Sequence, residues 1–321
     1  MVSDIQGSVI PFYLVSGFLG SGKTTFLKNV LSEFACNNRI AIIQNEFASS
    51  GIDGKELKMS GIDFKLVEVN NGSVFCICKM GTFIQSLKKL VTDYQPEMVF
   101  LESSGLADPV NIIELLQKEE IRLKIRLEHI FTIVDAPNFE RGMQLLPRVK
   151  NQIMIADTVI INKSDIYNGK LSVIRNQVKN MNPFARIIET IYCKADLNNL
   201  VPSGNKFFSS DPSNDNKHEA AFVFHGRKSD GKPSINACVL KTHEKITIEG
   251  LQSFIYELQK SSPRIKGYVN LQNGKVMAVH SIFYHMEIKE IFSYKGISEM
   301  IVFGEDITPR NLRNLFKNFI I

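Results

Sequence analysis

The chain has 321 residues, of which 44% are hydrophobic and 22% charged, and its formal net charge is only +5. This balance is typical of a globular protein with one large or two ordinary domains, and the scattered basic residues disfavour a nucleic-acid-binding stripe. No apolar stretch is long enough to span a bilayer, residues 1–7 lack a signal-peptide pattern, and the five cysteines lack a disulfide-type spacing. We therefore expect a cytoplasmic protein whose partners include neither nucleic acid nor membrane.

Seven short apolar runs in the first two-thirds of the chain are rich in β-branched or aromatic residues, and helix-like runs such as residues 25–34 separate them. Runs that are apolar throughout are typical of strands buried on both faces of a parallel sheet. The alternation predicts an α/β fold with a doubly wound, mainly parallel sheet and ligands at the carboxyl ends of its strands. The predicted strands are Phe12–Val15, Ile40–Gln44, Lys65–Val69, Met98–Leu101, Ile130–Val134, Thr158–Ile161 and Arg186–Glu189.

The composition changes after residue 197. Residues 198–217 are rich in Asn, Ser, Pro and Asp, which predicts a linker or long surface loop. Residues 218–321 then read as a smaller α+β domain, with a hairpin turn at Asn273-Gly274. Its predicted strands are 221–224, 237–240, 266–270, 275–280 and 300–303, and its predicted helices are 251–259 and 309–319.

The first predicted strand leads into the segment GFLGSGKT, residues 17–24, and a helix-compatible run follows it. This strand–loop–helix setting is the one that a phosphate-binding loop requires. Its glycines let backbone N–H groups surround a triphosphate, and we expect Lys23 to reach the β- and γ-phosphates and the Thr24 hydroxyl to bind magnesium. The residues predicted to bind the nucleotide here are Gly17, Gly20, Ser21, Gly22, Lys23, Thr24 and Thr25.

The tetrapeptide Asn-Lys-Ser-Asp, residues 162–165, follows the apolar run 158–161. In such a segment the Asp165 carboxylate accepts from guanine N1–H and the exocyclic amine, a donor pattern that adenine lacks. The wrong base would leave a buried carboxylate unpaired, so the segment favours guanine over adenine. We expect Asn162 to brace the loop and contact the base edge, and the stem of Lys163 to lie across the ring.

Two further segments follow predicted strands at the same sheet edge. Glu102 ends the strand at residues 98–101, with Gly105 three positions on, so Glu102 can hold a magnesium-bound water and the Gly105 N–H can approach the γ-phosphate. The alternative for Glu102 is a strand-end carboxylate that caps the next loop. The segment Asn45–Phe47 is either a switch segment or an ordinary β-to-α turn, and the sequence leaves both open.

Taken together, these segments resemble the CobW family of P-loop GTPases, which is related to HypB and UreG. The stretches that carry the resemblance are 16–25, 45–53, 70–78, 102–109, 134–139, 152–165, 264–268 and 301–304. The resemblance implies a P-loop GTPase domain over residues 1–197 and the family's second domain over residues 218–321. It further implies GTP hydrolysis with magnesium, coupled to handling zinc or cobalt for a client metalloenzyme or corrinoid-related protein.

The cysteine loop departs from the family pattern of Cys-x-Cys-Cys after a glycine. Here Gly72 is followed by Ser-Val-Phe-Cys-Ile-Cys-Lys, so either Cys76 alone matches, or Cys76 and Cys78 match the first pair and Lys79 replaces the third thiol. Two thiolates do not close a tetrahedral site, so a third ligand must come from elsewhere or from a partner. A strand over residues 74–78 would put both sulfurs on one face, which suits a metal or a redox pair.

Other residues bear on the same question. The alternative for Cys76 and Cys78 is that both are buried structural thiols. We interpret Cys36, Cys193 and Cys238 as structural, and we expect Cys193 to lie near the base. Gln44 and Ser49 stand where many relatives have Glu.

Three functions remain open. The first is a GTP-driven metal chaperone, and the second is a regulatory GTPase that gates a partner enzyme without carrying metal. The third is a P-loop kinase for a small molecule, which Asn-Lys-x-Asp argues against. Lys23, Thr24 with magnesium, Glu102 and Gly105 supply positioning and charge, but we find no general base or arginine finger. Slow intrinsic turnover, stimulated by a partner or by a homodimer, is therefore expected.

Overall fold

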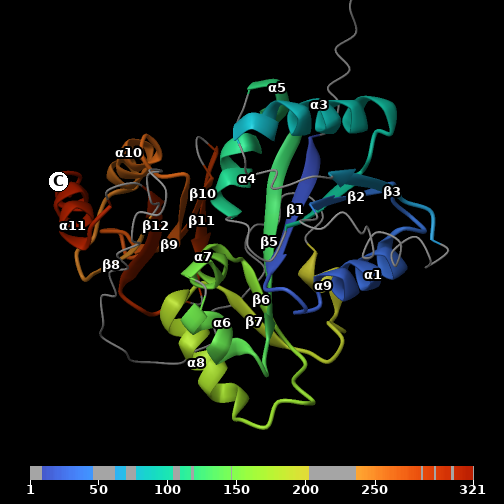
Figure 1. The fold of residues 1–321 in the computed structure, drawn as a ribbon. Coiled ribbons are helices and arrows are strands. Elements are labelled where there is room, and N and C mark those ends of the chain that lie inside the picture. Colours follow the sequence, from blue (N-terminus) through green and yellow to red (C-terminus); the bar gives the residue numbers. More distant parts are fainter. Residues whose placement is uncertain are drawn as a thin grey trace, which may run out of the picture. The chain divides into compact units, whose positions relative to one another are not determined.

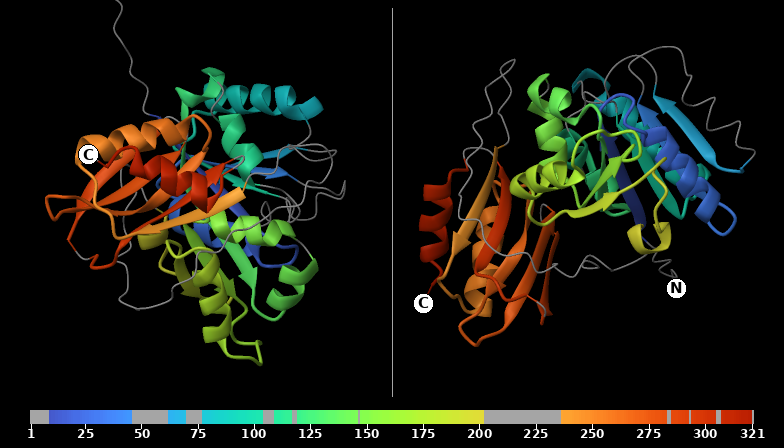
Figure 2. Two further views of the ribbon diagram at one scale, coloured as in Figure 1. Left: turned by 90° about the vertical axis from the view of Figure 1, so that its left-hand side faces the viewer. Right: turned by 90° about the horizontal axis from the view of Figure 1, so that it is seen from below.

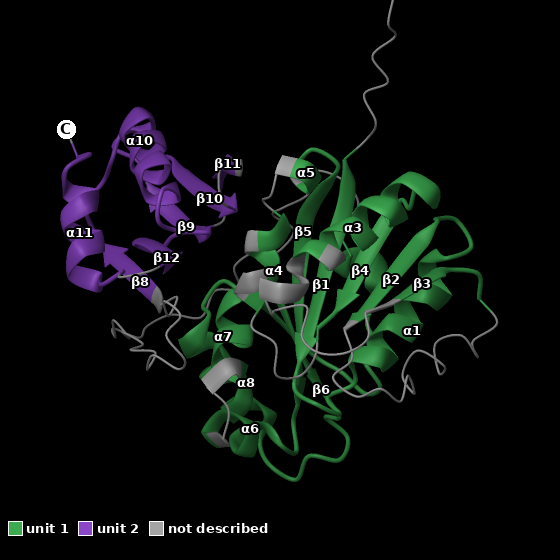
Figure 3. Cartoon of the chain, turned by 45° about the horizontal axis from the view of Figure 1, so that its top comes forward, with its two compact units in different colours: residues 1–206 green, residues 207–321 purple. Residues whose placement is uncertain are grey.

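The computed structural model describes residues 9–45, 62–69, 77–103, 109–116, 119–145, 147–201, 236–282, 285–292, 294–304 and 307–320. The chain divides into two compact units, residues 1–206 and residues 207–321 (Figure 3). This division falls within the segment that the composition marks as a linker, whose limits remain a prediction. Within the described part of the chain, no helix has the length and apolar character that crossing a membrane requires.

The first unit is built on a seven-stranded parallel sheet in the order β3-β2-β4-β1-β5-β6-β7 (Figure 1). Its strands are β1 Ile10–Gly17, β2 Ile40–Asn45, β3 Lys65–Val69, β4 Met98–Glu102, β5 Ile125–Asp135, β6 Thr158–Asn162 and β7 Arg186–Glu189. Strands β4 and β6 are buried along their whole length, as strands covered on both faces must be. The predicted doubly wound sheet is confirmed.

Helices cover both faces of this sheet. On one face, α1 (Lys23–Phe34) and α9 (Leu197–Leu200) pack against a core that includes Ile160 of β6. On the other face, α7 (Pro147–Ile155) and α8 (Leu171–Met181) pack against Val159 and Ile161, because successive side chains of a strand point to opposite faces. The remaining helices of the unit are α3 Ile77–Asp93, α4 Pro109–Leu116, α5 Glu119–Arg122 and α6 Phe139–Leu145.

The strand register brings the carboxyl ends of the central strands together. Val15 of β1 lies beside Glu102, Gln44 of β2 also lies beside Glu102, and Asp135 lies beside Asn162. The segments that follow these strands therefore gather at one edge of the sheet, where doubly wound folds bind ligands.

The second unit holds a five-stranded antiparallel sheet in the order β11-β10-β9-β12-β8, with both helices packed on one face (Figure 2). Its elements are β8 Asn236–Thr242, α10 Ile248–Gln259, β9 Arg264–Asn270, β10 Val276–Ile282, β11 His285–Ile291, β12 Ser298–Gly304 and α11 Pro309–Lys317. The rings of Phe254 and Phe316 meet edge-on at 5.1 Å between the two helices. This architecture confirms a separate α+β domain.

Three details differ from the sequence predictions or sharpen them. Strand β11 was not predicted, because its alternating charged residues hide a half-buried edge strand. The hairpin at Asn273-Gly274 is confirmed, with Gly274 at φ 84° between the antiparallel strands β9 and β10. Helix α9 occupies the start of the predicted linker, because Leu197 and Leu200 bury in the core of the first unit. The predicted strand 221–224 lies outside the described residues.

Candidate nucleotide-binding site

The segment between β1 and α1 has the backbone of a phosphate-binding loop. Gly17, Gly20 and Gly22 adopt φ values of 143°, 75° and 111°, which side-chain-bearing residues rarely adopt. A Cβ on Gly17 would collide with the Ile133 carbonyl oxygen, and one on Gly22 would lie 2.5 Å from Asn162 Nδ2. Two of the three glycines are thus required both by conformation and by the close approach of a neighbouring strand or loop.

The start of helix α1 is suited to an anion. Its first turn contains no acidic residue, and within the described residues no side chain caps it. The first N–H groups of a helix carry partial positive charge and need an outside partner, so this end attracts phosphate. The buried ammonium of Lys23 lies on the loop itself, 3.1 Å from the Gly17 carbonyl oxygen and 3.3 Å from that of Phe18.

Glu102 lies beside the loop at the end of β4. Thr24 Oγ1 donates to Glu102 Oε1 at 3.2 Å, and Gln44 Nε2 donates to Glu102 Oε2 at 2.9 Å. The structure therefore brings together the two residues predicted to hold magnesium. It also adds Gln44, which the sequence analysis noted only as a departure from relatives.

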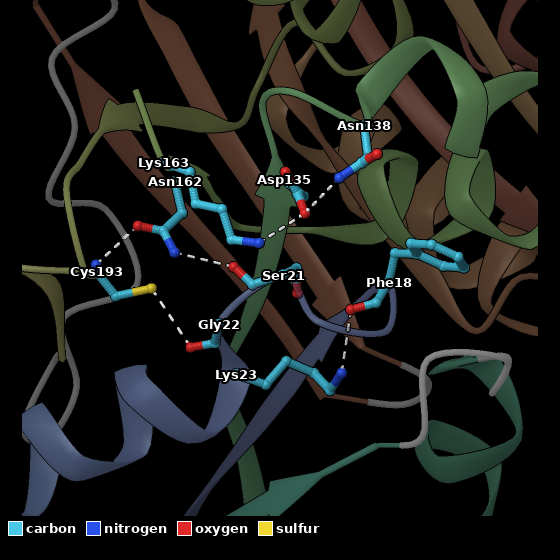
Figure 4. A network of polar contacts seen from close by, with 9 residues as sticks. All are labelled: Phe18, Ser21, Gly22, Lys23, Asp135, Asn138, Asn162, Lys163 and Cys193. Atoms are coloured by element: carbon cyan, nitrogen blue, oxygen red, sulfur yellow. Dashed lines mark hydrogen bonds and ion pairs between the residues drawn. The ribbon is translucent and has the colours of Figure 1, made fainter. Parts of the chain in front are cut away.

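Asn162 joins the loop after β6 to the phosphate loop, as Figure 4 shows. Its Nδ2 donates to the Ser21 carbonyl oxygen at 2.9 Å, while its Oδ1 accepts from Cys193 N at 2.8 Å and from Thr190 Oγ1 at 3.2 Å. The Asn162 side chain is only 3% exposed, so these bonds form away from water. Three separate segments are therefore held together by one amide.

Lys163 has a partner that the sequence analysis did not identify. Its Nζ forms an ion pair with Asp135 Oδ2 at 2.8 Å, and Asn138 Nδ2 donates to the same oxygen at 3.0 Å (Figure 4). Lys163 itself adopts φ 61°, and its side chain reaches Asp135 at the end of β5. Asp165, the predicted base-reading carboxylate, is exposed.

The loop after β7 closes the arrangement. Tyr192 and Cys193 are both left-handed, with φ 51° and 53°, and the Asn29 amide of α1 donates to both of their carbonyl oxygens at 3.0 and 3.1 Å. Cys193 Sγ lies 3.4 Å from the Gly22 carbonyl oxygen. Burial raises the pKa of the Cys193 thiol to about 12, so it stays neutral. The structure places this thiol behind the phosphate loop.

The structure says less about the predicted metal loop. Gly105, Glu46 and Cys76 lie outside the described residues, and the described part contains no group of three His, Cys, Asp or Glu side chains that could hold a metal ion. Helix α3 begins at Ile77, so Cys78 lies in its first turn. The prediction of a strand that extends to Cys78, with the sulfurs alternating onto one face, is therefore wrong.

Comparison with protein families agrees with this site. Residues 11–189 match the model described as CobW/HypB/UreG, nucleotide-binding domain. That range runs from β1 to β7 and contains the phosphate loop, Glu102 and residues 162–165.

Individual relatives extend the comparison. A zinc chaperone CobW of Sinorhizobium sp is 28% identical over 197 residues, which are 53% of this chain and 55% of that protein. A zinc-regulated GTPase metalloprotein activator 1 of Dictyostelium discoideum is 24% identical over 293 residues, 78% of this chain and 57% of that protein. The chain thus matches about half the length of these curated relatives.

Among solved structures, the zinc-bound YjiA GTPase from E. coli superposes with a TM-score of 0.62 at 19% identity. The superposition covers 98% of this chain and all of the other. At this identity the comparison establishes a shared fold that extends through both units.

Proposed function

The chain belongs to the CobW/HypB/UreG family, and on that basis we propose that it binds and slowly hydrolyses GTP. We further propose that hydrolysis is coupled to handling a divalent metal, zinc or cobalt, for a partner metalloenzyme. The observation that carries the nucleotide half is the Asn162–Ser21 hydrogen bond, which fixes the base-reading segment against the phosphate loop.

Buried polar atoms support a triphosphate at this place. The Ser21 hydroxyl is fully buried and bonds to no described residue, so it can donate a hydrogen bond to an incoming phosphate oxygen. Lys23 Nζ donates to the carbonyl oxygens of Gly17 and Phe18, and a charged phosphate oxygen is a stronger acceptor for an ammonium group than a neutral carbonyl oxygen is. Gly20 leaves open space where a side chain would stand. These features fit a ligand rich in negative oxygens.

Thr24 and Glu102 fit magnesium. Hydroxyl and carboxylate oxygens are the ligands that this ion prefers, and when bound it neutralises charge on the phosphates. Thr24 would ligate it directly and Glu102 through a water, as the sequence predicts. Lys23 and the N–H groups of α1 position the phosphates, while the carboxylate of Asp165 selects guanine. Without a recognised general base, slow turnover is the expected result.

The metal half rests on the relatives and on Cys76 and Cys78. Curated relatives are named zinc chaperones or a zinc-regulated metalloprotein activator, and these names motivate zinc as the metal to test first. Two thiolates need a third ligand from elsewhere in the chain, from a client or from a second copy. A regulatory GTPase without cargo metal is the second candidate, because Lys79 stands where a third thiolate would complete the site.

Titration calorimetry with GTP, GDP and ATP tests the nucleotide half, and GTP is expected to bind at least about tenfold more tightly than ATP. Equilibrium dialysis with zinc, with and without a non-hydrolysable GTP analogue, tests the metal half. The double variant Cys76→Ser/Cys78→Ser should lose zinc, whereas Cys36→Ser, at an exposed thiol, should retain it. A wild-type chain that binds no zinc below millimolar concentration would leave the regulatory GTPase as the function, whereas equal zinc binding by the double variant would show that Cys76 and Cys78 are not the zinc ligands.

A further inference from the structure

Gln44 and Glu102 form a buried polar pair across two neighbouring strands. The parallel register of β2 and β4 sets them side by side, at the carboxyl ends of both strands. Gln44 is 3% exposed and Glu102 is 7% exposed, so water does not separate them. Because water is excluded at this depth, no solvent molecule competes for the hydrogen bond between the two side chains, and this bond fixes their relative orientation.

The two carboxylate oxygens of Glu102 accept hydrogen bonds from different residues. Gln44 Nε2 donates to Glu102 Oε2 at 2.9 Å, and the acceptor-only carboxylate fixes which end of the amide faces it. Glu102 Oε1 is left toward Thr24, whose hydroxyl donates to it at 3.2 Å. The Gln44 amide therefore restrains the rotation of the carboxylate without touching the phosphate loop.

Gln44 brings a neutral group to this position. A second carboxylate beside Glu102 would repel it or share a proton with it, whereas an amide donates to it and adds no charge. No described residue donates to Gln44 Oε1, which remains a neutral acceptor at the same strand end. Hydrogen bonds to an ionised group are about twice as strong as neutral ones, so the restraint is substantial.

We propose that Gln44 is a positioning residue for magnesium: its amide holds Glu102 in the orientation that binds the ion's water beside Thr24. The inference rests on the proposed binding of GTP with magnesium at this site. Gln44 acts through Glu102 rather than on the nucleotide. Loss of the Gln44 amide should therefore weaken the binding of magnesium at this site and leave the binding of metal-free nucleotide unchanged.

The experiment follows the release of a fluorescent GDP from the full chain as magnesium is varied. Gln44→Met keeps the length of the side chain and removes the donor. We expect it to raise the magnesium concentration that half-maximally slows release by about tenfold, the usual effect of one lost hydrogen bond to a charged group. Release in excess EDTA should match that of the wild-type protein.

A double-variant comparison separates positioning from general packing. In a Glu102→Ala background, Gln44→Met should cause no further change in the magnesium midpoint, because the group through which it acts is gone. Gln259→Met is the matched control, since Gln259 is a buried glutamine in the other unit that donates to Ser281 Oγ at 2.8 Å. It should leave the midpoint unchanged.

If Gln44→Met does not fold, Gln44→Asn, which is one methylene shorter, serves instead with the same expected shift.

Two results would overturn the inference, and they differ. A wild-type chain that releases GDP at the same rate with and without magnesium removes the proposed magnesium site and the inference with it. A wild-type chain that responds to magnesium while Gln44→Met shares its midpoint, or shifts it equally in the Glu102→Ala background, removes the inference alone.

Discussion

The side-chain amide of Asn162 donates to the Ser21 carbonyl oxygen at 2.9 Å, across 141 residues of sequence. The same amide accepts from the backbone of Cys193, so the phosphate loop and the loops after β6 and β7 share one buried connection. Buried networks of this kind fix the relative placement of the groups they join. In the proposed GTP site, this connection would couple base recognition to phosphate binding through a single residue.

Asn162→Ala should consequently lose both stability and nucleotide affinity. Leaving the Ser21 and Cys193 backbone groups unpaired is expected to lower the free energy of unfolding by about 2–3 kcal/mol. Asn182→Ala is the matched control, because Asn182 is equally buried and donates to three carbonyl oxygens of α7 and its end, away from the phosphate loop. Urea denaturation should show similar losses for both variants, and calorimetry should show weaker GTP binding for Asn162→Ala alone. Equal GTP affinity in the two variants would contradict the coupling.

Two glycines of the phosphate loop should respond differently to alanine. Gly20 and Gly22 both have positive φ, which costs a side-chain-bearing residue about 1–2 kcal/mol. A Cβ on Gly22 also lies 2.5 Å from Asn162 Nδ2 and 3.2 Å from Cys193 Sγ, whereas one on Gly20 meets nothing within 4 Å. Gly22→Ala should therefore unfold at a clearly lower temperature than Gly20→Ala in a thermal melt, and similar melting temperatures would argue against this packing.

The strands of the first sheet could be predicted because their chemistry is local. Strands β4 and β6 are apolar except at their ends and are buried along their whole length, and β3 has the predicted bounds Lys65–Val69. Strand β5 begins at Ile125, earlier than predicted. Its first residues include Arg126 and Glu128, which form an ion pair with each other, and these charged side chains hide the apolar pattern of a buried strand. The phosphate loop and residues 162–165 were likewise found from residue types at fixed spacing.

The supporting residues of the site could not be predicted in this way. Gln44 contacts Glu102 across 58 positions, and Asp135 contacts Lys163 across 28, so both contacts depend on the order of strands in the sheet. The sequence shows that these residues are present, but it does not show which strands are neighbours or how they are aligned. Asp135 had been noted only within a stretch that resembles the family, and Asn29 carried no signal, because a polar residue on a helix surface is ordinary.

The cysteines should separate by reactivity. Burial raises the pKa of Cys193 to about 12 and that of Cys238 to about 11, while Cys36 is exposed. Because the thiolate is the reactive form, iodoacetamide at pH 8 should label Cys36 in the native protein and reach Cys193 and Cys238 only on unfolding. Peptide mapping by mass spectrometry measures this. Native labelling of Cys193 as fast as that of Cys36 would show that the loop is open.

The same thiol predicts a loss of stability at alkaline pH. The unfolded thiol ionises near its ordinary value of 9.0, and the folded one near 12, so the unfolded state loses its proton first as pH rises. The contribution of Cys193 is therefore complete below pH 9 and disappears as the pH approaches 12. Cys193→Ala should show a shallower decline in the free energy of unfolding over this window than the wild-type chain, and parallel declines would refute it.

The Lys163–Asp135 pair should support nucleotide binding. Asp135→Asn removes the charge that holds the Lys163 ammonium, and we expect GTP affinity to fall about tenfold. Glu189→Gln, which breaks the exposed Arg175–Glu189 pair of the same 2.8 Å length, should have no such effect. Isothermal titration at low and at high salt measures the GTP affinity of both variants. Unchanged affinity for Asp135→Asn would show that GTP binding does not depend on the ion pair of Lys163.

Base selection by Asp165 is tested most directly by exchanging hydrogen-bond acceptor for donor. Xanthine carries a carbonyl where guanine carries its exocyclic amine, so an amide in place of the carboxylate suits xanthine. The wild-type chain should bind GTP more tightly than XTP or ATP by titration calorimetry, and Asp165→Asn should reverse the preference between GTP and XTP. Equal affinity of the wild-type chain for GTP and ATP, or an unchanged preference in Asp165→Asn, would contradict a guanine-nucleotide site at this sheet edge.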